Sequence, residues 1–283
     1  MITKIICPVD FSPVAINAVE YAARLCQVFG SRLILLNAQK LKTMDATFNL
    51  REGVFTESIR RSSENASEVL NKMSVEIGIA FRIAVDYKVD VTHKSLASVV
   101  SSSVEGKAMV VMGTNGPDDL FQFFFGTNTF RVTKNENCPV FIVPHNVSYG
   151  AIKKILLTWD DKADNKKYIE IVNGILSSFD ANLEFLNVSA KGLRSGSNGF
   201  GKDGFNQFRR DILPQIRPIG EVVFRHIISN DVTSAILKHM HVSEADLLCV
   251  VHHQRDWVED MLHNSITRQL SEISDYPMIV FRD

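Results

Sequence analysis

The stretch Lys4-Ile-Ile-Cys-Pro-Val-Asp10 returns 150 residues later as Lys154-Ile-Leu-Leu-Thr-Trp-Asp160. In both places an apolar run, typical of a strand buried in a parallel sheet, ends in an aspartate. Arg32-Leu-Ile-Leu-Leu-Asn37 repeats at the same distance as Asn182-Leu-Glu-Phe-Leu-Asn187. Because an internal repeat decides the architecture before any local assignment, we predict two copies of one domain.

Two further pairs keep the same order along the chain. Asp90-Val-Thr92 matches Asp231-Val-Thr233 at a shift of 141 residues, and the apolar stretch that begins at Cys138 matches the one that begins at Tyr276 at a shift of 138. The second copy is therefore shorter by 150 − 138 = 12 residues. We expect the domains to span residues 1–146 and 147–283, with a short connector between them.

Short β-rich runs alternate with stretches of helical period in each copy, which is typical of βαβ units and a parallel sheet. The predicted fold class is α/β, with two tandem doubly wound domains that each have a five-stranded parallel sheet in the order 3-2-1-4-5, flanked by helices. Strands are expected near residues 3–9, 32–38, 81–86, 108–112 and 139–143, and again near 152–158, 182–188, 221–228, 246–251 and 277–281.

The first helix has clear boundary signals. Ser12 fits the N-cap, Pro13 fits the first helical position, and Gly30 follows the last apolar residue of the pattern. Later helices of the first copy are expected over residues 59–77, 94–104 and 127–135.

The composition excludes several classes of protein. The chain has 283 residues with 45% apolar and 22% charged, so it is long and apolar enough for two packed domains and is not mainly disordered. Its 31 Lys and Arg against 32 Asp and Glu give a net charge of −1, which favours neither nucleic acid nor an anionic membrane as partner. Without a membrane-length apolar run, and with Asp10 too early for a signal peptide, we expect a cytoplasmic protein. The four scattered cysteines are expected to be reduced core thiols.

A glycine pattern in the first copy points to a phosphate site. The apolar run that ends at Met112 is followed by Gly113-Thr-Asn-Gly116, nine residues, and then Gly126-Thr127-Asn128, which is G-x2-G-x9-G-[ST]. Glycines after a strand let backbone N–H groups approach a ligand, and a Gly-Thr at a helix start presents unpaired N–H groups and a hydroxyl. A polyphosphate fits that arrangement.

Asp10 is the second candidate element of this site. In the order 3-2-1-4-5 the connections diverge between the first and fourth strands, so Asp10 and Gly113 are expected to face one crevice. There the Asp10 carboxylate would bind a ribose hydroxyl or hold Mg²⁺ near phosphates. Alternatively it serves the start of the following helix, and the two roles do not exclude each other.

Together, the Pro-Val-Asp-Phe-Ser ending of the first strand, the glycine pattern and the closing Cys-Pro-Val-Phe-Ile-Val strand resemble the universal stress protein (UspA) family. The resemblance covers nearly all of residues 1–146 and, more faintly, 150–283, so the whole looks like a tandem two-domain member. It implies ATP binding in one branch of the family and no nucleotide in the other, and this sequence keeps all three glycines of the ATP-binding branch. If the family's site is transferred to this sequence, Asp10 would lie beside the adenosine, and Pro8 and the Ala38 backbone would border the adenine. Met112 and Gly113 would follow along the site. Gly116, Gly126, Thr127 and Asn128 would hold the phosphates and ribose.

The second copy lacks the glycines. The corresponding positions are Val251, Gln254 and Asn264, although Ser265 keeps a hydroxyl and Asp160 keeps the aspartate. Valine and glutamine disfavour positive φ and fill the space where a phosphate would approach. We therefore predict one ATP site per chain, with Mg²⁺ accompanying the nucleotide, and a structural or regulatory role for the second copy.

The expected function is an ATP-binding sensor or regulatory module in stress response, read by an unidentified protein partner. One alternative is a slow ATPase or phosphotransferase, although no Walker lysine and no evident base accompany the motif. Another is a nucleotide-free protein-interaction module. Enzymatic activity beyond weak ATP hydrolysis is not indicated, and no catalytic residue is assigned.

Three further features carry alternatives. A histidine- and aspartate-rich stretch at residues 252–263, with His239 and His241 nearby, matches no standard zinc spacing, so no metal site is expected there. The aromatic stretch 120–125 is either buried or forms a lid or partner surface. The apolar last strands of the two copies are edge candidates that must be paired or covered. Because universal stress domains typically dimerise through that strand, the resemblance implies an intramolecular pseudo-dimer of the two copies, with further homo-oligomerisation left open.

Overall fold

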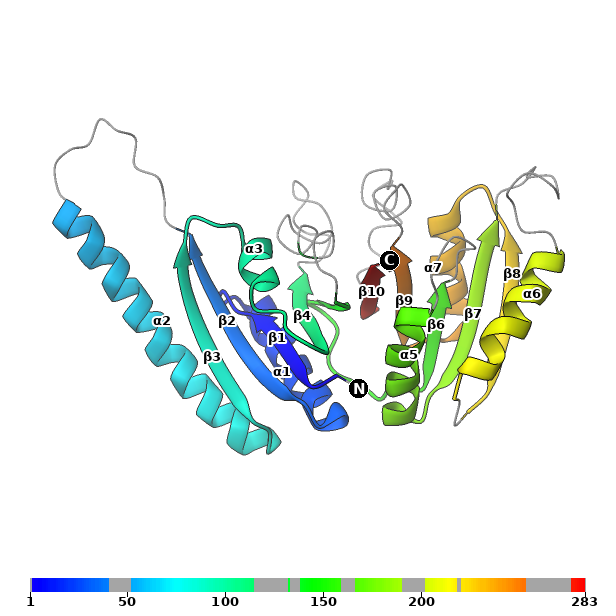
Figure 1. Cartoon of the computed structure of the whole chain (residues 1–283), viewed down its shortest axis with the longest axis horizontal. Helices are drawn as coiled ribbons and strands as arrows, with labels where there is room; N and C mark the ends of the chain where they lie inside the picture. The colour runs from blue at the N-terminus through cyan, green and yellow to red at the C-terminus, as the bar shows by residue number, and fades with distance from the viewer. Residues whose placement is uncertain are drawn as a thin grey trace.

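The computed structural model describes residues 2–40, 52–114, 132, 138–158, 166–189, 202–217, 220–252 and 276–282. In these residues one ten-stranded sheet runs through the whole molecule in the order β3-β2-β1-β4-β5-β10-β9-β6-β7-β8 (Figure 1). The first half of the chain contributes β1 (Lys4–Pro8), β2 (Arg32–Lys40), β3 (Val85–Thr92), β4 (Ala108–Thr114) and β5 (Val140–Pro144). The second half contributes β6 (Lys154–Thr158), β7 (Asn182–Ser189), β8 (Val222–Ile228), β9 (Leu247–His252) and β10 (Met278–Arg282).

Each half of the sheet has the predicted topology. Within the first half the order is β3-β2-β1-β4-β5, and within the second it is β8-β7-β6-β9-β10, which is 3-2-1-4-5 in both. All strand pairs inside a half are parallel. The predicted fold class, a tandem doubly wound α/β protein, is therefore confirmed.

The two halves meet through their last strands. β5 and β10 pair antiparallel, with Ile142 opposite Met278, Phe141 opposite Ile279, and Val140 opposite Val280. These side chains are buried, so the two apolar edges cover each other.

Helices pack on both faces of this sheet. One core contains residues of α1 (Pro13–Phe29), α2 (Glu52–Phe81), α5 (Lys166–Phe179) and α6 (Lys202–Ile212). The other core contains residues of α3 (Leu96–Ser101) and α7 (Val232–Ser243). A 3₁₀ turn (Leu213–Gln215) follows α6. Alternate residues of β1 belong to opposite cores, Ile5 to the first and Ile6 to the second. None of the helices in the described ranges is long and apolar enough to cross a membrane.

The first core is continuous between the halves. The Tyr21 ring of α1 lies 5.2 Å from the ring of Phe141 and 5.1 Å from that of Tyr149, which follows β5. Phe29 at the end of α1 packs edge-on against Phe179 at the end of α5. The two copies therefore share buried aromatic contacts as well as a sheet.

The signals for α1 are confirmed, whereas the third strand lies later than expected. The Ser12 hydroxyl accepts a hydrogen bond from the Ala15 amide at 3.2 Å, and Gly30 ends the helix at φ 63°. Sequence reasoning placed a strand at 81–86, but α2 continues to Phe81, Arg82 ends it in the left-handed region at φ 54°, and β3 follows. The apolar residues around position 81 belong to the helix, while the sheet-edge strand alternates apolar and charged residues. α3 is shorter than the expected 94–104, and the expected helix at 127–135 lies outside the described residues.

Candidate functional site

The candidate site lies where the connections of the first half diverge. β1 leads into α1 on one face of the sheet, while α3, which precedes β4, packs on the other face. The register between β1 and β4 ends at Ile6 opposite Val110, although β1 continues to Pro8 and β4 to Thr114. The carboxyl ends of these two strands thus form the topological switch point at which doubly wound sheets bind ligands.

Asp10 follows β1 at this point and is exposed. Its Oδ1 atom accepts hydrogen bonds from the Ser12 amide at 3.0 Å and from the Ser12 hydroxyl at 2.6 Å. Ser12 in turn caps α1, so Asp10 does support the helix start, as the alternative interpretation proposed. The second carboxylate oxygen, Oδ2, has no hydrogen-bond partner among the described residues and can accept a further donor.

Phe11 lies between these two polar residues in a strained conformation. Its φ is 65°, in the left-handed region that a bulky non-glycine residue rarely adopts, and its side chain is 38% exposed. Such backbone costs on the order of 1–3 kcal/mol and occurs preferentially at functional sites. No signal in the sequence identified Phe11, because phenylalanine is not a residue type that indicates a positive φ.

Gly113, near the end of β4, lies directly against the first turn of α1. It is not among the described glycines with positive φ, which are Gly30 and Gly106. A Cβ atom at position 113 would lie 2.6 Å from the carbonyl oxygen of Val14 and 2.7 Å from its Cγ1 atom. The glycine is therefore required because the first turn of α1 packs directly on β4, and the argument from positive φ is wrong here.

Two neighbouring residues of β2 complete the described part of the site. The buried Asn37 side chain donates from Nδ2 to the Val9 carbonyl oxygen at 2.7 Å, which anchors the residue before Asp10. Ala38 follows and is half-buried. Sequence reasoning missed Asn37, although it recurs as Asn187 in the repeat, which was the available signal.

The remaining predicted residues divide into two groups. Pro8 and Met112 are buried at the ends of β1 and β4, on the same edge of the sheet as Asp10. The other four lie outside the described residues, as do the aromatic stretch 120–125 and Asp160: they are Gly116, Gly126, Thr127 and Asn128.

The thiol nearest this edge of the sheet is unreactive. Burial raises the pKa of the Cys7 thiol, next to Pro8, far above its ordinary value, with the nearby Cys26 adding to the effect. That sulfur stays protonated and is no nucleophile. Within the described ranges no three potential metal-ligating side chains gather. Asp10 provides an exposed carboxylate at this edge that can contact a ligand hydroxyl or a cation.

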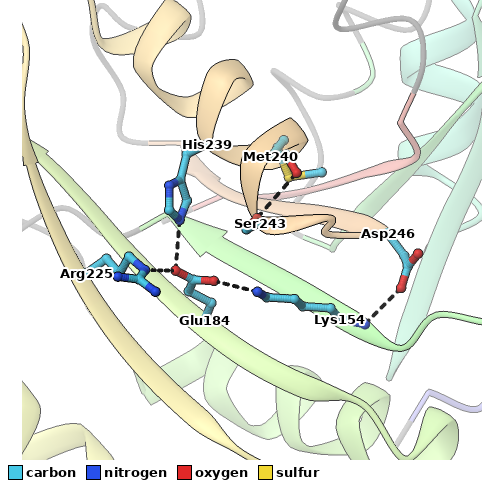
Figure 2. A network of polar contacts seen from close by, with 7 residues as sticks. All are labelled: Lys154, Glu184, Arg225, His239, Met240, Ser243 and Asp246. Atoms are coloured by element: carbon cyan, nitrogen blue, oxygen red, sulfur yellow. Dashed lines mark hydrogen bonds and ion pairs between the residues drawn. The ribbon is translucent and has the colours of Figure 1, made fainter.

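The second half contains a separate polar cluster, shown in Figure 2. Glu184 of β7 is 1% exposed and contacts Lys154 Nζ at 3.0 Å, Arg225 Nε at 2.7 Å and His239 Nε2 at 2.8 Å. Burial alone would raise the pKa of Glu184, but the hydrogen bonds from His239, Lys154 and Arg225 outweigh it and lower the pKa. His239 is therefore hydrogen-bonded within this cluster, and sequence reasoning had considered it only as a metal ligand.

Comparison with known proteins decides the family. Residues 1–144 match the model of the Universal stress protein family. The chain belongs to this family. Universal stress protein MJ0577 of Methanocaldococcus jannaschii is 26% identical over 159 residues, which cover 50% of this chain and 95% of that protein. Universal stress protein MJ0531 of the same organism is 24% identical over 146 residues, which cover 50% of this chain and 81% of that protein.

Solved structures resemble the whole of this universal stress protein. A universal stress protein from Archaeoglobus fulgidus aligns with a TM-score of 0.73 at 18% identity and covers 99% of this chain and 98% of its own. A universal stress protein from Pseudomonas aeruginosa aligns with a TM-score of 0.60 at 14% identity, and the alignment covers 99% of this chain and 93% of that chain. At these identities the likeness concerns the fold, and it extends over both halves of the chain.

Proposed function

We propose that this universal stress protein binds ATP, together with Mg²⁺, at the carboxyl ends of β1, β2 and β4, and acts as a nucleotide-responsive regulatory or sensor module in stress response. Asp10 would accept hydrogen bonds from the ribose, and the strand ends beside it would border the base. The phosphates would lie on backbone N–H groups of the glycine pattern. The proposed contacts are Pro8, Asp10, Ala38, Met112, Gly113, Gly116, Gly126, Thr127 and Asn128.

The observation that carries this proposal is the strained, exposed turn Asp10-Phe11-Ser12 at the switch point. A helix cap alone needs only Ser12, yet the chain also holds Phe11 at φ 65° and leaves Asp10 Oδ2 without a partner among the described residues. Family membership and the G-x2-G-x9-G-[ST] pattern support the same place. With a net charge of −1, the anion would be held by backbone dipoles and not by a basic surface.

The second half would serve as the partner of the first. We take the units to be residues 1–146 and 147–283, and the antiparallel β5–β10 pair to be the intramolecular counterpart of a dimer contact. On this proposal one chain forms a pseudo-dimer with one nucleotide site. Occupancy near β4 would be sensed at β5 and hence at β10, because these strands are consecutive in the sheet.

A nucleotide-free protein-interaction module is the second candidate. Two observations favour it: Asp10 already supports the start of α1, and packing against Val14 by itself explains Gly113. Neither feature then requires a ligand.

Matched substitutions in the two halves distinguish these candidates. We expect Thr127→Val to weaken ATP binding about tenfold by removing one hydroxyl contact, and the control Ser265→Ala to leave it unchanged. Asp10→Asn retains an acceptor for Ser12 but loses the charge, so it should weaken binding as well, with Asp160→Asn as its control. Isothermal titration with ATP and Mg²⁺ measures all four variants.

The nucleotide content of freshly purified protein, measured by mass spectrometry, gives an independent result. Bound ATP supports the proposal, whereas an empty protein that gives no heat with ATP contradicts it and favours the nucleotide-free module. Phosphate release that Thr127→Val abolishes and Ser265→Ala does not would indicate a slow ATPase instead.

A further inference from the structure

A pocket of about 220 Å³ lies at the junction of the two halves. The first half supplies Phe29 at the end of α1 and residues 106–108 at the start of β4, and the second half supplies Ile171 and Gly174 of α5. We call this space the junction pocket. It lies where β4 begins, whereas Asp10 follows the end of the parallel strand β1, so the junction pocket and the proposed nucleotide site are at opposite edges of the sheet.

The junction pocket has apolar walls and a charged rim. Ile2, Ala108 and Cys138 line it and are buried. Lys107 and Glu170 also line it, with their charged atoms 3.8 Å apart and their side chains 64% and 79% exposed. An ion pair as exposed as this one is weak, so either group can turn towards a polar atom of a bound molecule at little cost. The pocket therefore suits an apolar molecule with one polar group.

The repeat shows what occupies the corresponding place on α1. The helices α1 and α5 end 150 residues apart, which is the shift of the repeat, so the counterpart of Ile171 in α1 is Tyr21. The counterpart of Gly174 is Arg24. The ring of Tyr149, in the connector, lies 5.1 Å from the Tyr21 ring, and the Arg24 guanidinium lies 5.4 Å from the centre of the Tyr149 ring. An aromatic ring therefore packs on α1 at the positions that line the junction pocket on α5.

Smaller side chains on α5 leave room for such a ring. An isoleucine and a glycine stand where α1 has a tyrosine and an arginine. A Cβ atom added at Gly174 would have no atom within 4 Å. A cavity of about 150 Å³ lined by apolar side chains can hold benzene, so the junction pocket is large enough for one aromatic ring with a small substituent.

We propose that the junction pocket binds a small phenol-like molecule, that is, a single aromatic ring with one polar substituent. The ring would lie against Ile171 and over Gly174, in the position relative to α5 that Tyr149 has relative to α1. Its hydroxyl would face the rim, where the Glu170 carboxylate can accept a hydrogen bond and the Lys107 ammonium can donate one. Because both halves supply walls of the pocket, the bound molecule would stabilise their junction.

The probe is p-cresol, which is the side chain of tyrosine as a free molecule. Saturation-transfer NMR titration of the full chain should give a dissociation constant on the order of 0.1–1 mM, as expected for a ligand of this size. The melting temperature should rise with p-cresol concentration, because the ligand binds the native state. The cyclohexanol analogue of p-cresol, which has no aromatic ring, should bind at least about threefold more weakly.

Substitutions that fill the junction pocket locate the binding. Gly174→Leu should weaken p-cresol binding at least about tenfold, because the leucine side chain takes the space of the ring, and it should raise the melting temperature of the free protein. Ile171→Phe fills the pocket from the neighbouring position and should weaken binding in the same way, which keeps the test decisive if one variant does not fold. Gly150→Leu is the matched control, since an added Cβ atom there also has no atom within 4 Å, but Gly150 is exposed in the connector and should leave the affinity unchanged.

Four results would overturn the proposal. They are no binding of p-cresol at about 5 mM, unchanged affinity in both filled variants, equal affinity for the cyclohexanol analogue, and displacement of p-cresol by ATP, which would place the probe at the nucleotide site. Failure of ATP to bind in the titrations above would leave these measurements intact, because the two sites lie at opposite edges of the sheet.

Discussion

Replacing Glu184 by glutamine should destabilise the second half of the molecule through its buried ion-pair network. The substitution keeps the shape of the side chain but removes its charge and one acceptor oxygen. Oε1 now contacts Arg225 and His239, and Oε2 contacts Lys154 (Figure 2). The new amide oxygen can take over one of these roles, but the amide nitrogen would then face another hydrogen-bond donor.

The size of the effect follows from the exposure of the three partners. Breaking a fully buried ion pair costs about 3–5 kcal/mol because it leaves an uncompensated charge. Here the Lys154 and Arg225 side chains are 30% and 57% exposed and can turn towards water, whereas that of His239 is only 11% exposed. We therefore expect a loss of about 3 kcal/mol in the free energy of unfolding, at the lower end of that range, and a fall of roughly 5–10 °C in melting temperature.

Urea unfolding measures the loss as a lower midpoint at an unchanged slope. Glu170→Gln is the control, because its side chain is 79% exposed and lies 3.8 Å from Lys107, so it should change stability by less than about 0.5 kcal/mol. Equal effects of the two substitutions would refute the reasoning, since the argument depends on the burial of Glu184.

The difference between wild type and Glu184→Gln should also depend on pH. Because the folded pKa of Glu184 is lowered, its contribution is complete above the unfolded value of about 4.3 and is lost as the pH falls through the folded value. The two unfolding midpoints should therefore differ fully at pH 7 and converge in acid. A gap that stays constant from neutral pH into acid would contradict the assigned ionisation.

Two further predictions concern the first half. Gly113→Ala should lower the free energy of unfolding by about 1–3 kcal/mol, because its Cβ would lie 2.6 Å from the Val14 carbonyl oxygen. Gly174→Ala in α5, with no atom within 4 Å of the added Cβ, should instead raise it by about 0.5–1 kcal/mol. Thermal melting compares the two variants, and effects of equal sign would contradict the packing. The native protein should not react with a thiol reagent at pH 8, since burial raises the pKa of Cys7 and Cys249 and raises that of Cys26 to about 12; rapid reaction before unfolding would disprove the burial.

The repeat predicted most of the fold because strand order follows from few rules. Once the apolar runs at 4–10 and 154–160 were aligned, the remaining strands followed at similar distances, and the order 3-2-1-4-5 was adopted as one that doubly wound sheets use. β3 was misplaced because it lies at the sheet edge, where hydrogen bonds on one side and exposed alternate residues weaken the apolar signal. α2 instead ends at Arg82, whose φ is 54°. An arginine gives no indication in the sequence of such a left-handed conformation.

The sequence predicted which strands carry Asp10 and Gly113 but not the local backbone around them. Asp10 follows β1 as expected, whereas Gly113 lies within β4 and not after it. The strain at Phe11 and the bond from Asn37 to the Val9 carbonyl depend on the path of the backbone, which spacing alone does not give. Glu184 illustrates the same limit, because its burial depends on Lys154, Arg225 and His239, which reach it from three other elements.

The contact between Gly113 and Val14 changes the meaning of the divergence between the halves. Val251 occupies the corresponding position in β9. Because packing against Val14 is sufficient reason for a glycine at position 113, the loss of this glycine in the second copy does not by itself indicate the loss of a ligand site. The inference of one nucleotide site per chain therefore depends on Gly116 and Gly126, which Gln254 and Asn264 replace, and testing it requires substitutions there.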